Sequence, residues 1–338
     1  MHKQLYTAED VFGAKTTKEE IQSYIVDNEA LRQQFLELNA EHQQKYIDFL
    51  MGERGMPIQF DAVFKRIFDP EIHPERLENL TETVFGEKIK IKRVLPNTGI
   101  QLIDHGTFVV MDVVAELVDG SFINVEMQKL GFRFPSKRTS CYLADMVMRQ
   151  YNRVKAEKGK RFTYNDIQKT YMFIIIAKSE PEFWSVPDQY IHRKMEYYDS
   201  GIKLPETEKV AYITLDTFCN TIHNIDNKAE AWLTFLSKDD AESIVKLVNK
   251  YPEFLEIYQE IKEFRRRPEE VLGMWSEALY ILDKNTERFM VDELREQVAE
   301  KDQQLEQKDQ QLEQKNQQLA QADQRIAELE AQLAAIQK

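Results

Sequence analysis

The sequence predicts an α/β fold in which a mixed sheet is flanked by helices, and three observations support this. Two alternating apolar runs, 108–117 and 121–128, flank Asp119-Gly120, a dipeptide typical of a β-hairpin. A continuous apolar run at 170–177 is rich in Ile and aromatic residues, as expected of a strand buried on both faces. Segments with apolar residues at helical spacing precede and follow these strands. The predicted core order is αβββαβ.

Residues 1–56 predict a helical N-terminal extension. Residues 17–20, Thr-Lys-Glu-Glu, have the form of a capping box, and residues 28–52 carry apolar side chains at helical spacing. Gly55 and Pro57 follow and interrupt the helical pattern. The core is therefore expected to begin at residue 57 and to extend to residue 220.

The core elements follow from local patterns. Residues 88–95 alternate Ile or Val with Lys or Arg, which predicts a half-buried strand. Prolines and polar residues at 178–188 and 204–209 predict loops. In chain order, the predicted elements are helices 60–69 and 74–85, strand 88–95, the hairpin strands 108–117 and 121–128, helix 136–157, strand 170–177 and strand 210–216.

The segment 221–291 predicts a helical subdomain. Its apolar residues recur at helical intervals, and Pro252 and Pro268 stand where helices are expected to start, a position that tolerates a missing N–H. Trp232 and Trp275 are expected in its core rather than on a base-stacking surface.

Residues 292–338 predict a coiled coil that joins copies of the chain into a homo-oligomer. Five consecutive seven-residue units occupy 301–335, and a period of seven implies a left-handed supercoil. Three Lys at the d position weaken the seam, and a linker without specific function is the alternative. The a positions are Val298, Leu305, Leu312, Leu319, Ile326 and Leu333, and the d positions are Leu294, Lys301, Lys308, Lys315, Ala322, Leu329 and Ile336.

Composition excludes several classes of protein. No apolar run reaches the ~18 residues of a membrane helix, and the N-terminus has no apolar region typical of a signal peptide. Cys141 and Cys219 are the only cysteines, without a Cys/His pattern for zinc. We therefore expect a cytoplasmic protein without a membrane partner.

Two carboxylates on the predicted hairpin, Asp112 and Glu126, form the most informative pair. A two-residue turn at Asp119-Gly120 would place Asp112 opposite Met127, and the two acids would then lie on opposite faces. A three-residue loop with Gly120 in the left-handed region would instead place Asp112 across from Glu126, with Cβ atoms roughly 5 Å apart. Such a pair needs a cation or a shared proton, and hard oxygen ligands favour Mg²⁺ or Mn²⁺. The alternative is a surface hairpin whose acids face water.

The wider pattern resembles the PD-(D/E)XK nucleases. An Asp on one strand and Glu126-Met127-Gln128 on the next are similar to the D…ExK signature, with Gln in place of Lys. The ordered series resembles the nuclease-type transposases of the Rpn, or recombination-promoting nuclease, group over about residues 57–290. This series consists of FDAVFKRIFDP (60–70), the hairpin with NVEMQ (124–128), RTSCY (138–142) and TYMFIII (170–176).

The resemblance implies a restriction-endonuclease-like fold and a role for each residue. The metal would be held by Asp112, Glu126 and the backbone carbonyl of Met127, and catalysis would use Asp112, Glu126 and Gln128. Gln128 can position a water but carries no charge to lower its pKa. Asp61 stands where the family has a further acid that binds metal through water, and its alternative role is a first-turn acid stabilised by the helix dipole.

Charge is unevenly distributed along an acidic chain. The net charge is −13, yet residues 129–161 contain ten Lys or Arg and two acids. Arg suits phosphate oxygens because its guanidinium donates in a fork. A solvated helix face is the alternative to DNA binding. The residues predicted to bind DNA are Lys129, Lys137, Arg138, Arg149 and Arg153.

The sequence thus predicts an Mg²⁺-dependent DNA endonuclease that hydrolyses phosphodiester bonds in recombination or transposition. The alternative is a catalytically weak or inactive nuclease-fold protein that acts as a coiled-coil interaction scaffold.

Overall fold

The computed structural model describes residues 5–96, 111–130 and 136–276, with four single positions at 298, 301, 305 and 308. The chain divides into two compact units, 1–280 and 281–338. Across the described residues, no helix combines the length and the apolar character needed to cross a membrane.

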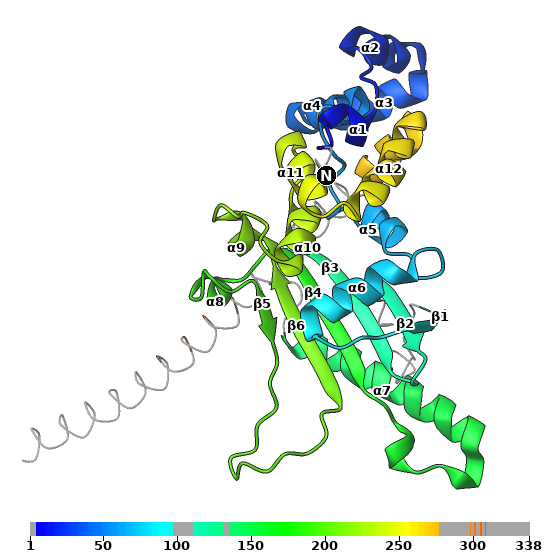
Figure 1. The fold of residues 1–338 in the computed structure, drawn as a ribbon, viewed down its shortest axis with the longest axis vertical. Helices are drawn as coiled ribbons and strands as arrows, with labels where there is room; N and C mark the ends of the chain where they lie inside the picture. The colour runs from blue at the N-terminus through cyan, green and yellow to red at the C-terminus, as the bar shows by residue number, and fades with distance from the viewer. Residues whose placement is uncertain are drawn as a thin grey trace, which may run out of the picture. The chain divides into compact units, whose positions relative to one another are not determined.

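A six-stranded mixed sheet forms the centre of the first unit (Figure 1). Its strands lie in the order β1-β2-β3-β4-β6-β5, where β3, β4 and β6 are parallel and the other neighbours are antiparallel. The mixed α/β class is therefore confirmed. The strands are β1 (Ile91–Val94), β2 (Val113–Leu117), β3 (Phe122–Leu130), β4 (Thr170–Lys178), β5 (Ile191–Arg193) and β6 (Glu208–Thr214).

Helices cover both faces of the sheet because alternate strand residues point in opposite directions. Helices α5 (Asp61–Ile67) and α6 (Pro74–Phe85) share one buried cluster with residues such as Val113 and Val125. Helix α7 (Ser136–Lys158) shares a second cluster with residues such as Val114. Figure 1 shows α6 crossing the first of these faces.

The hairpin between β2 and β3 has the three-residue loop. Val114 pairs with Asn124, and the amide of Leu117 donates to the carbonyl of Ser121 at 2.8 Å, which leaves residues 118–120 in the loop. Gly120 has a φ of 90°, a conformation that costs glycine little and other residues more. This register favours the alternative that places Asp112 opposite Glu126.

The four N-terminal helices pack with the helices that follow the sheet. Trp275, which is fully buried, lies between Tyr46 and Phe60, with ring centroids 6.1 and 5.2 Å away. The two groups of helices therefore share one apolar core. The N-terminal helices are α1 (Ala8–Phe12), α2 (Lys18–Asp27), α3 (Glu29–Glu37) and α4 (Ala40–Met51), and the later ones are α10 (Lys228–Ser237), α11 (Ala241–Lys250), α12 (Phe254–Glu263) and residues 268–276.

Some elements differ from the prediction. The segment expected to be loop at 178–188 contains a short helix, α8 (Pro181–Trp184), and the three-residue edge strand β5 was not predicted. Helix α9 (Leu215–Cys219) begins where the predicted strand 210–216 was expected to end. These elements are too short to show a periodicity in sequence.

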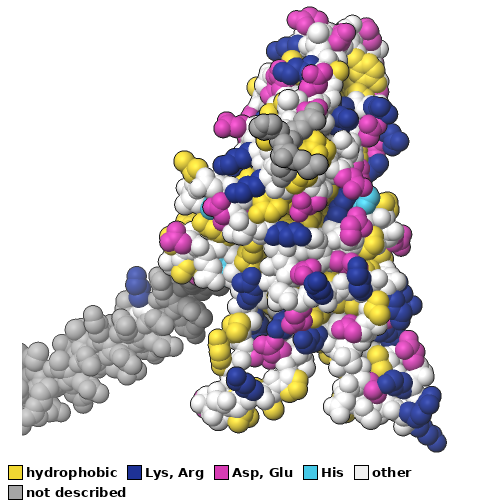
Figure 2. All heavy atoms as spheres, viewed as in Figure 1, with side chains coloured by type: hydrophobic (Ala, Val, Ile, Leu, Met, Phe, Trp, Pro, Cys, Tyr) yellow, Lys and Arg dark blue, Asp and Glu magenta, His cyan; other side chains and the backbone are white. Residues whose placement is uncertain are grey.

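On the face shown in Figure 2, Lys and Arg side chains are interspersed with Asp and Glu. Of the second unit, Val298, Lys301, Leu305 and Lys308 are helical, and Val298 and Leu305 are 56% and 58% exposed. The predicted coiled coil otherwise lies outside the described residues.

Candidate active site

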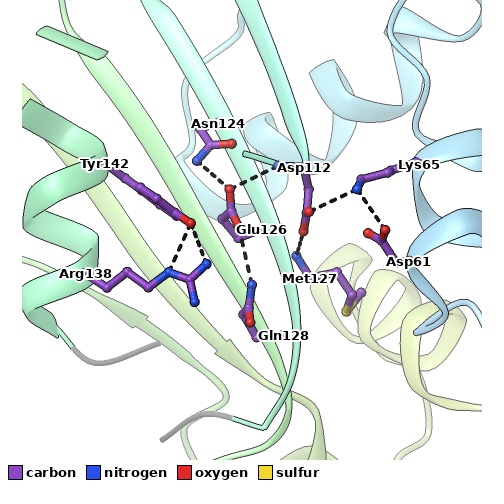
Figure 3. A network of polar contacts seen from close by, with 9 residues as sticks. All are labelled: Asp61, Lys65, Asp112, Asn124, Glu126, Met127, Gln128, Arg138 and Tyr142. Carbon is purple, nitrogen blue, oxygen red and sulfur yellow. Dashed lines mark hydrogen bonds and ion pairs between the residues drawn. The ribbon is translucent and has the colours of Figure 1, made fainter. Parts of the chain in front are cut away.

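Asp112 and Glu126 each accept a hydrogen bond from a backbone amide of the segment that carries the other acid (Figure 3). Asp112 immediately precedes β2, and Glu126 lies in the middle of β3. The amide of Asp112 donates to Oε1 of Glu126 at 3.2 Å, and the amide of Met127 donates to Oδ2 of Asp112 at 2.9 Å. The two predicted acids are therefore adjacent, each held by the neighbouring segment.

Glu126 is almost completely buried, with 1% of its surface exposed. Asn124 donates to its Oε1 at 3.0 Å, and Gln128 donates to its Oε2 at 3.4 Å. The three side chains are two residues apart along β3 and so share one face. Asn124 was not predicted as a site residue, although the same spacing of two that links Glu126 and Gln128 could have indicated it.

Asp112 lies nearer the surface, and a lysine from α5 contacts it. The Asp112 side chain is 16% exposed, and Nζ of Lys65 is 3.3 Å from its Oδ1. The same Nζ donates to Oδ2 of Asp61 at 2.8 Å, which is an i,i+4 pair on α5. The contact between Lys65 and Asp112 was not predicted, because it joins segments that are distant in sequence.

The pKa values of both acids are raised. Burial, and then the charge of Asp112, raises the pKa of Glu126 to about 8. Burial and the charge of Asp61 raise the pKa of Asp112, although Lys65 opposes this shift. The pair is therefore short of positive charge, which is the situation that a bound cation relieves.

The first turns of α7 face this acid pair. Arg138 donates from Nε to the hydroxyl of Tyr142 at 3.0 Å, and its charge favours the ionised form of Glu126, which lowers the pKa of that acid. Burial, and then the charge of Glu126, raises the pKa of Tyr142. Arg138 thus lies close to the acids, as its prediction as a DNA-binding residue requires.

Two of the arginines predicted to bind DNA contact acids of the protein instead. Arg149 is 11% exposed and pairs with the buried Asp145 at 2.7 Å. Arg153 is 20% exposed and pairs with Glu116, which is 2% exposed. The two arginines lie four residues apart on α7, and their charges stabilise buried carboxylates. Both guanidinium groups are thus engaged in ion pairs within the protein, and their contact with DNA stays a prediction.

Of the remaining predicted DNA-binding residues, Lys129 lies near the C-terminal end of β3 and Lys137 near the N-terminal end of α7. Nζ of Lys129 is 5.7 Å from the centre of the Phe60 ring, which directly precedes α5. Lys137 is exposed in the first turn of α7. Their contact with DNA stays a prediction.

The oxygen donors at the site suit a hard cation. Asp112 and Glu126 supply carboxylates, and the carbonyl of Met127 is a third candidate. In the part of the chain that the structure describes, no group of three or more His, Cys, Asp or Glu side chains could hold a metal. A metal at this site would therefore need backbone or water oxygens besides the two acids.

Comparison with protein-family models matches residues 58–288 to the PD-(D/E)XK nuclease family transposase model. The match covers more than half of the chain, and the protein belongs to this family of nucleases. Such nucleases are generally phosphodiesterases that typically use divalent metals, and the transposase family implies a DNA substrate. Neither the curated proteins nor the solved structures gave a match.

Proposed function

We propose that the protein is a metal-dependent DNA endonuclease of the Rpn group that acts in recombination or transposition. The observation that carries this proposal is the contact between Asp112 and Glu126, which lie within the region matched to the nuclease family. Two adjacent buried carboxylates destabilise the fold when both are charged, which is why their pKa values are raised. Such perturbed groups cluster at functional sites.

Asp112, Glu126 and the carbonyl of Met127 would hold Mg²⁺ or Mn²⁺. The fit rests on the shortage of positive charge at the pair. A further sign is Oδ1 of Asn124, a buried oxygen with no hydrogen-bond partner among the described residues. Such a metal, when bound, lowers the pKa of a water and stabilises charge on the phosphate.

Lys65 is proposed to supply the positive charge that Gln128 lacks. In the D…ExK signature a lysine on the strand polarises the attacking water. Here the ammonium of Lys65 reaches Asp112 from α5, and the Gln128 amide contacts Glu126. Lys65 would favour the deprotonated water, and Gln128 would orient it. Asp61 would hold Lys65 in place.

DNA would be bound beside the acid pair. Lys129 follows Gln128 on β3, and Lys137 and Arg138 lie in the first turn of α7. Their positive charges would contact phosphates flanking the cleaved bond.

A plasmid-nicking assay tests the proposal. We expect cleavage with Mg²⁺ or Mn²⁺ and none with EDTA. Asp112→Ala and Glu126→Ala should each abolish cleavage, because removing either acid disrupts the metal site. Far-ultraviolet circular dichroism would check that both variants fold. Equal nicking by wild type and variants would overturn the assignment.

The second candidate is a scaffold with a weak or inactive nuclease fold. The observation in its favour is the burial of Glu126, together with the neutral Gln128. If the wild-type protein does not nick plasmid DNA either with metal or with EDTA, this candidate is favoured.

A further inference from the structure

The far end of α7 projects away from the sheet (Figure 1). Helix α7 ends at Lys158 and is followed by two short 3-10 helices, η2 (Gly159–Arg161) and η3 (Tyr164–Asp166). We call residues 155–166 the α7 tip. It is a separate surface from the acid pair, which faces the first turns of the same helix.

The α7 tip is positively charged on an acidic protein. It contains four cations, Lys155, Lys158, Lys160 and Arg161, and two acids. Both acids are paired within the protein, since Asp166 binds Lys158 at 2.5 Å and Glu157 lies 3.7 Å from Arg153. Figure 2 shows Lys and Arg side chains gathered at the end of this projection, at the lower right.

Lys160 and Arg161 are the cations that remain available. Both are exposed, and neither forms an ion pair within the part of the chain that the structure describes. They occupy consecutive positions of η2. Two adjacent, exposed cations suit neighbouring phosphate groups, because each can donate to a separate oxygen without losing an internal contact.

Aromatic rings lie beside these cations. Tyr164 is 78% exposed and stacks on Tyr151, with ring centroids 6.3 Å apart and planes at 19°. Phe162 meets both rings edge-on. Phe162 and Tyr151 are partly buried and form a small apolar support. The outer face of Tyr164 is open, and an open ring among cations suits sugars or bases.

The length of α7 sets the distance between the α7 tip and the acid pair. Arg138 and Lys158 are 20 residues apart on one continuous helix. At a rise of ~1.5 Å per residue this spans about 30 Å. One turn of B-DNA, of about 10 base pairs, covers ~34 Å. A DNA that leaves the site along α7 would reach the α7 tip after roughly one turn.

We propose that the α7 tip is a second DNA-backbone contact, about one helical turn from the cleavage site. This inference rests on the proposed function, because the first contact is the nuclease site. Lys160 and Arg161 bind phosphates, and Tyr164 packs against the adjoining sugar or an unpaired base. The nuclease would then require a flanking arm of DNA for full affinity.

Fluorescence anisotropy tests this contact separately from catalysis. Binding is measured in EDTA on Asp112→Ala protein, with duplexes that range from well below to well above about 10 base pairs. We expect Lys160→Ala/Arg161→Ala to leave affinity for the shortest duplexes unchanged and to weaken binding of the long ones. On long duplexes the salt slope should fall by roughly 0.9 for each lost contact.

The matched control removes two exposed lysines elsewhere, Lys18→Ala/Lys228→Ala. It changes the net charge equally, so a general charge effect would appear in both proteins. If the tip variant and the control behave alike at every duplex length, the inference is overturned. A different result is that Asp112→Ala abolishes nicking while Lys160→Ala/Arg161→Ala binds long duplexes as well as the parent protein does. That result would support the proposed function and overturn only this inference.

Substrates with a paired or an unpaired arm distinguish the two ways in which Tyr164 could contact DNA. Tyr164→Ala is compared with Tyr164→Phe on substrates whose arm is either paired or unpaired. Several-fold weaker binding of Tyr164→Ala on the unpaired arm alone would show base stacking. Weaker binding on the paired arm would show contact with the duplex backbone, and both results support a DNA contact. Equal binding of both variants on both arms would remove Tyr164 from the contact.

Discussion

Lys65 and Asp112 come from a helix and a strand end 47 positions apart in sequence, yet Nζ of Lys65 lies 3.3 Å from Oδ1 of Asp112. The same ammonium is held by Asp61, one turn earlier on α5. Opposing effects act on Lys65: burial lowers its pKa, and the charges of Asp112 and Asp61 raise it, with a net rise. Lys65 is therefore a permanent cation at the edge of the acid pair.

Lys65→Ala should lower metal-dependent nicking by about 10²-fold, the typical loss when a polarising group is removed. Gln128→Lys alone should keep or increase activity and move the pH optimum down, because the added charge favours a deprotonated water. The double variant Lys65→Ala/Gln128→Lys should recover part of the lost rate. Initial rates on plasmid DNA measure all three. If the double variant is no more active than Lys65→Ala, a lysine at position 128 does not replace the charge of Lys65. Full activity in Lys65→Ala would exclude a catalytic role for Lys65.

The stability of the metal-free protein should fall as pH rises through the pKa of Glu126. Its folded-state pKa of about 8 exceeds the ordinary 4.5, so the folded protein binds more protons between these values. Stability is then fully present below about pH 4.5 and is lost toward pH 8, by at most ~1.4 kcal/mol per pH unit. Urea unfolding in EDTA at several pH values measures this. Glu126→Gln should flatten the dependence, and parallel curves for both proteins would contradict the pKa assignment.

Replacing Arg153 and Lys137 by Ala should affect different properties, the first the stability of the protein and the second its binding to DNA. Arg153→Ala should lower the free energy of unfolding by about 1–3 kcal/mol, since Glu116 is buried and loses a partner. Lys92 and Arg93 also bind Glu116 and limit the loss. Lys137→Ala should leave stability unchanged and reduce the salt slope of DNA binding by roughly 0.9. Chemical unfolding and salt-dependent binding, measured on both variants, check this. A large stability loss in Lys137→Ala would show that its side chain is structural.

Truncation before Asp292 should lower the oligomeric state while the remaining protein stays folded. Val298 and Leu305 are exposed in the single chain, so their apolar surface gains most by contact with another copy. Lys301 and Lys308 at the intervening positions should keep this association modest. Light scattering at micromolar concentration measures the mass. A full-length protein that is already a monomer would contradict the prediction.

The sequence predicted those features that depend on local chemistry. Asp119-Gly120 limited the hairpin to two registers, and the observed pairing of Val114 with Asn124 distinguishes them. The long apolar run in β4 and the helical pattern of α7 were also sufficient. Periodicity could identify the face of α7 that carries Arg149 and Arg153. It could not show that Glu116 of β2 lies beside Arg153, because tertiary packing places this acid there. The pairing of Arg149 with Asp145 is different, since the two residues are four apart on the same helix.

Residues that act together from distant segments could not be predicted in this way. Asn124 is not such a case, because it lies two residues before Glu126 on β3 and this spacing is visible in the sequence. Lys65 reaches Asp112 only because the fold brings α5 next to the start of β2. The contact between Lys65 and Asp112 leaves no pattern in a single sequence.

The family match starts at residue 58, but the support of the site starts earlier. Phe60, next to Asp61, packs on Trp275, and Trp275 also packs on Tyr46 of α4. A protein shortened to the matched region would expose the side of Trp275 that Tyr46 covers. The packing of Trp275 against Phe60, at the start of α5, would then be weakened. Cleavage by the isolated region should therefore be more heat-sensitive than cleavage by the whole chain. The N-terminal helices thus determine the temperature up to which Lys65 keeps its position beside Asp112.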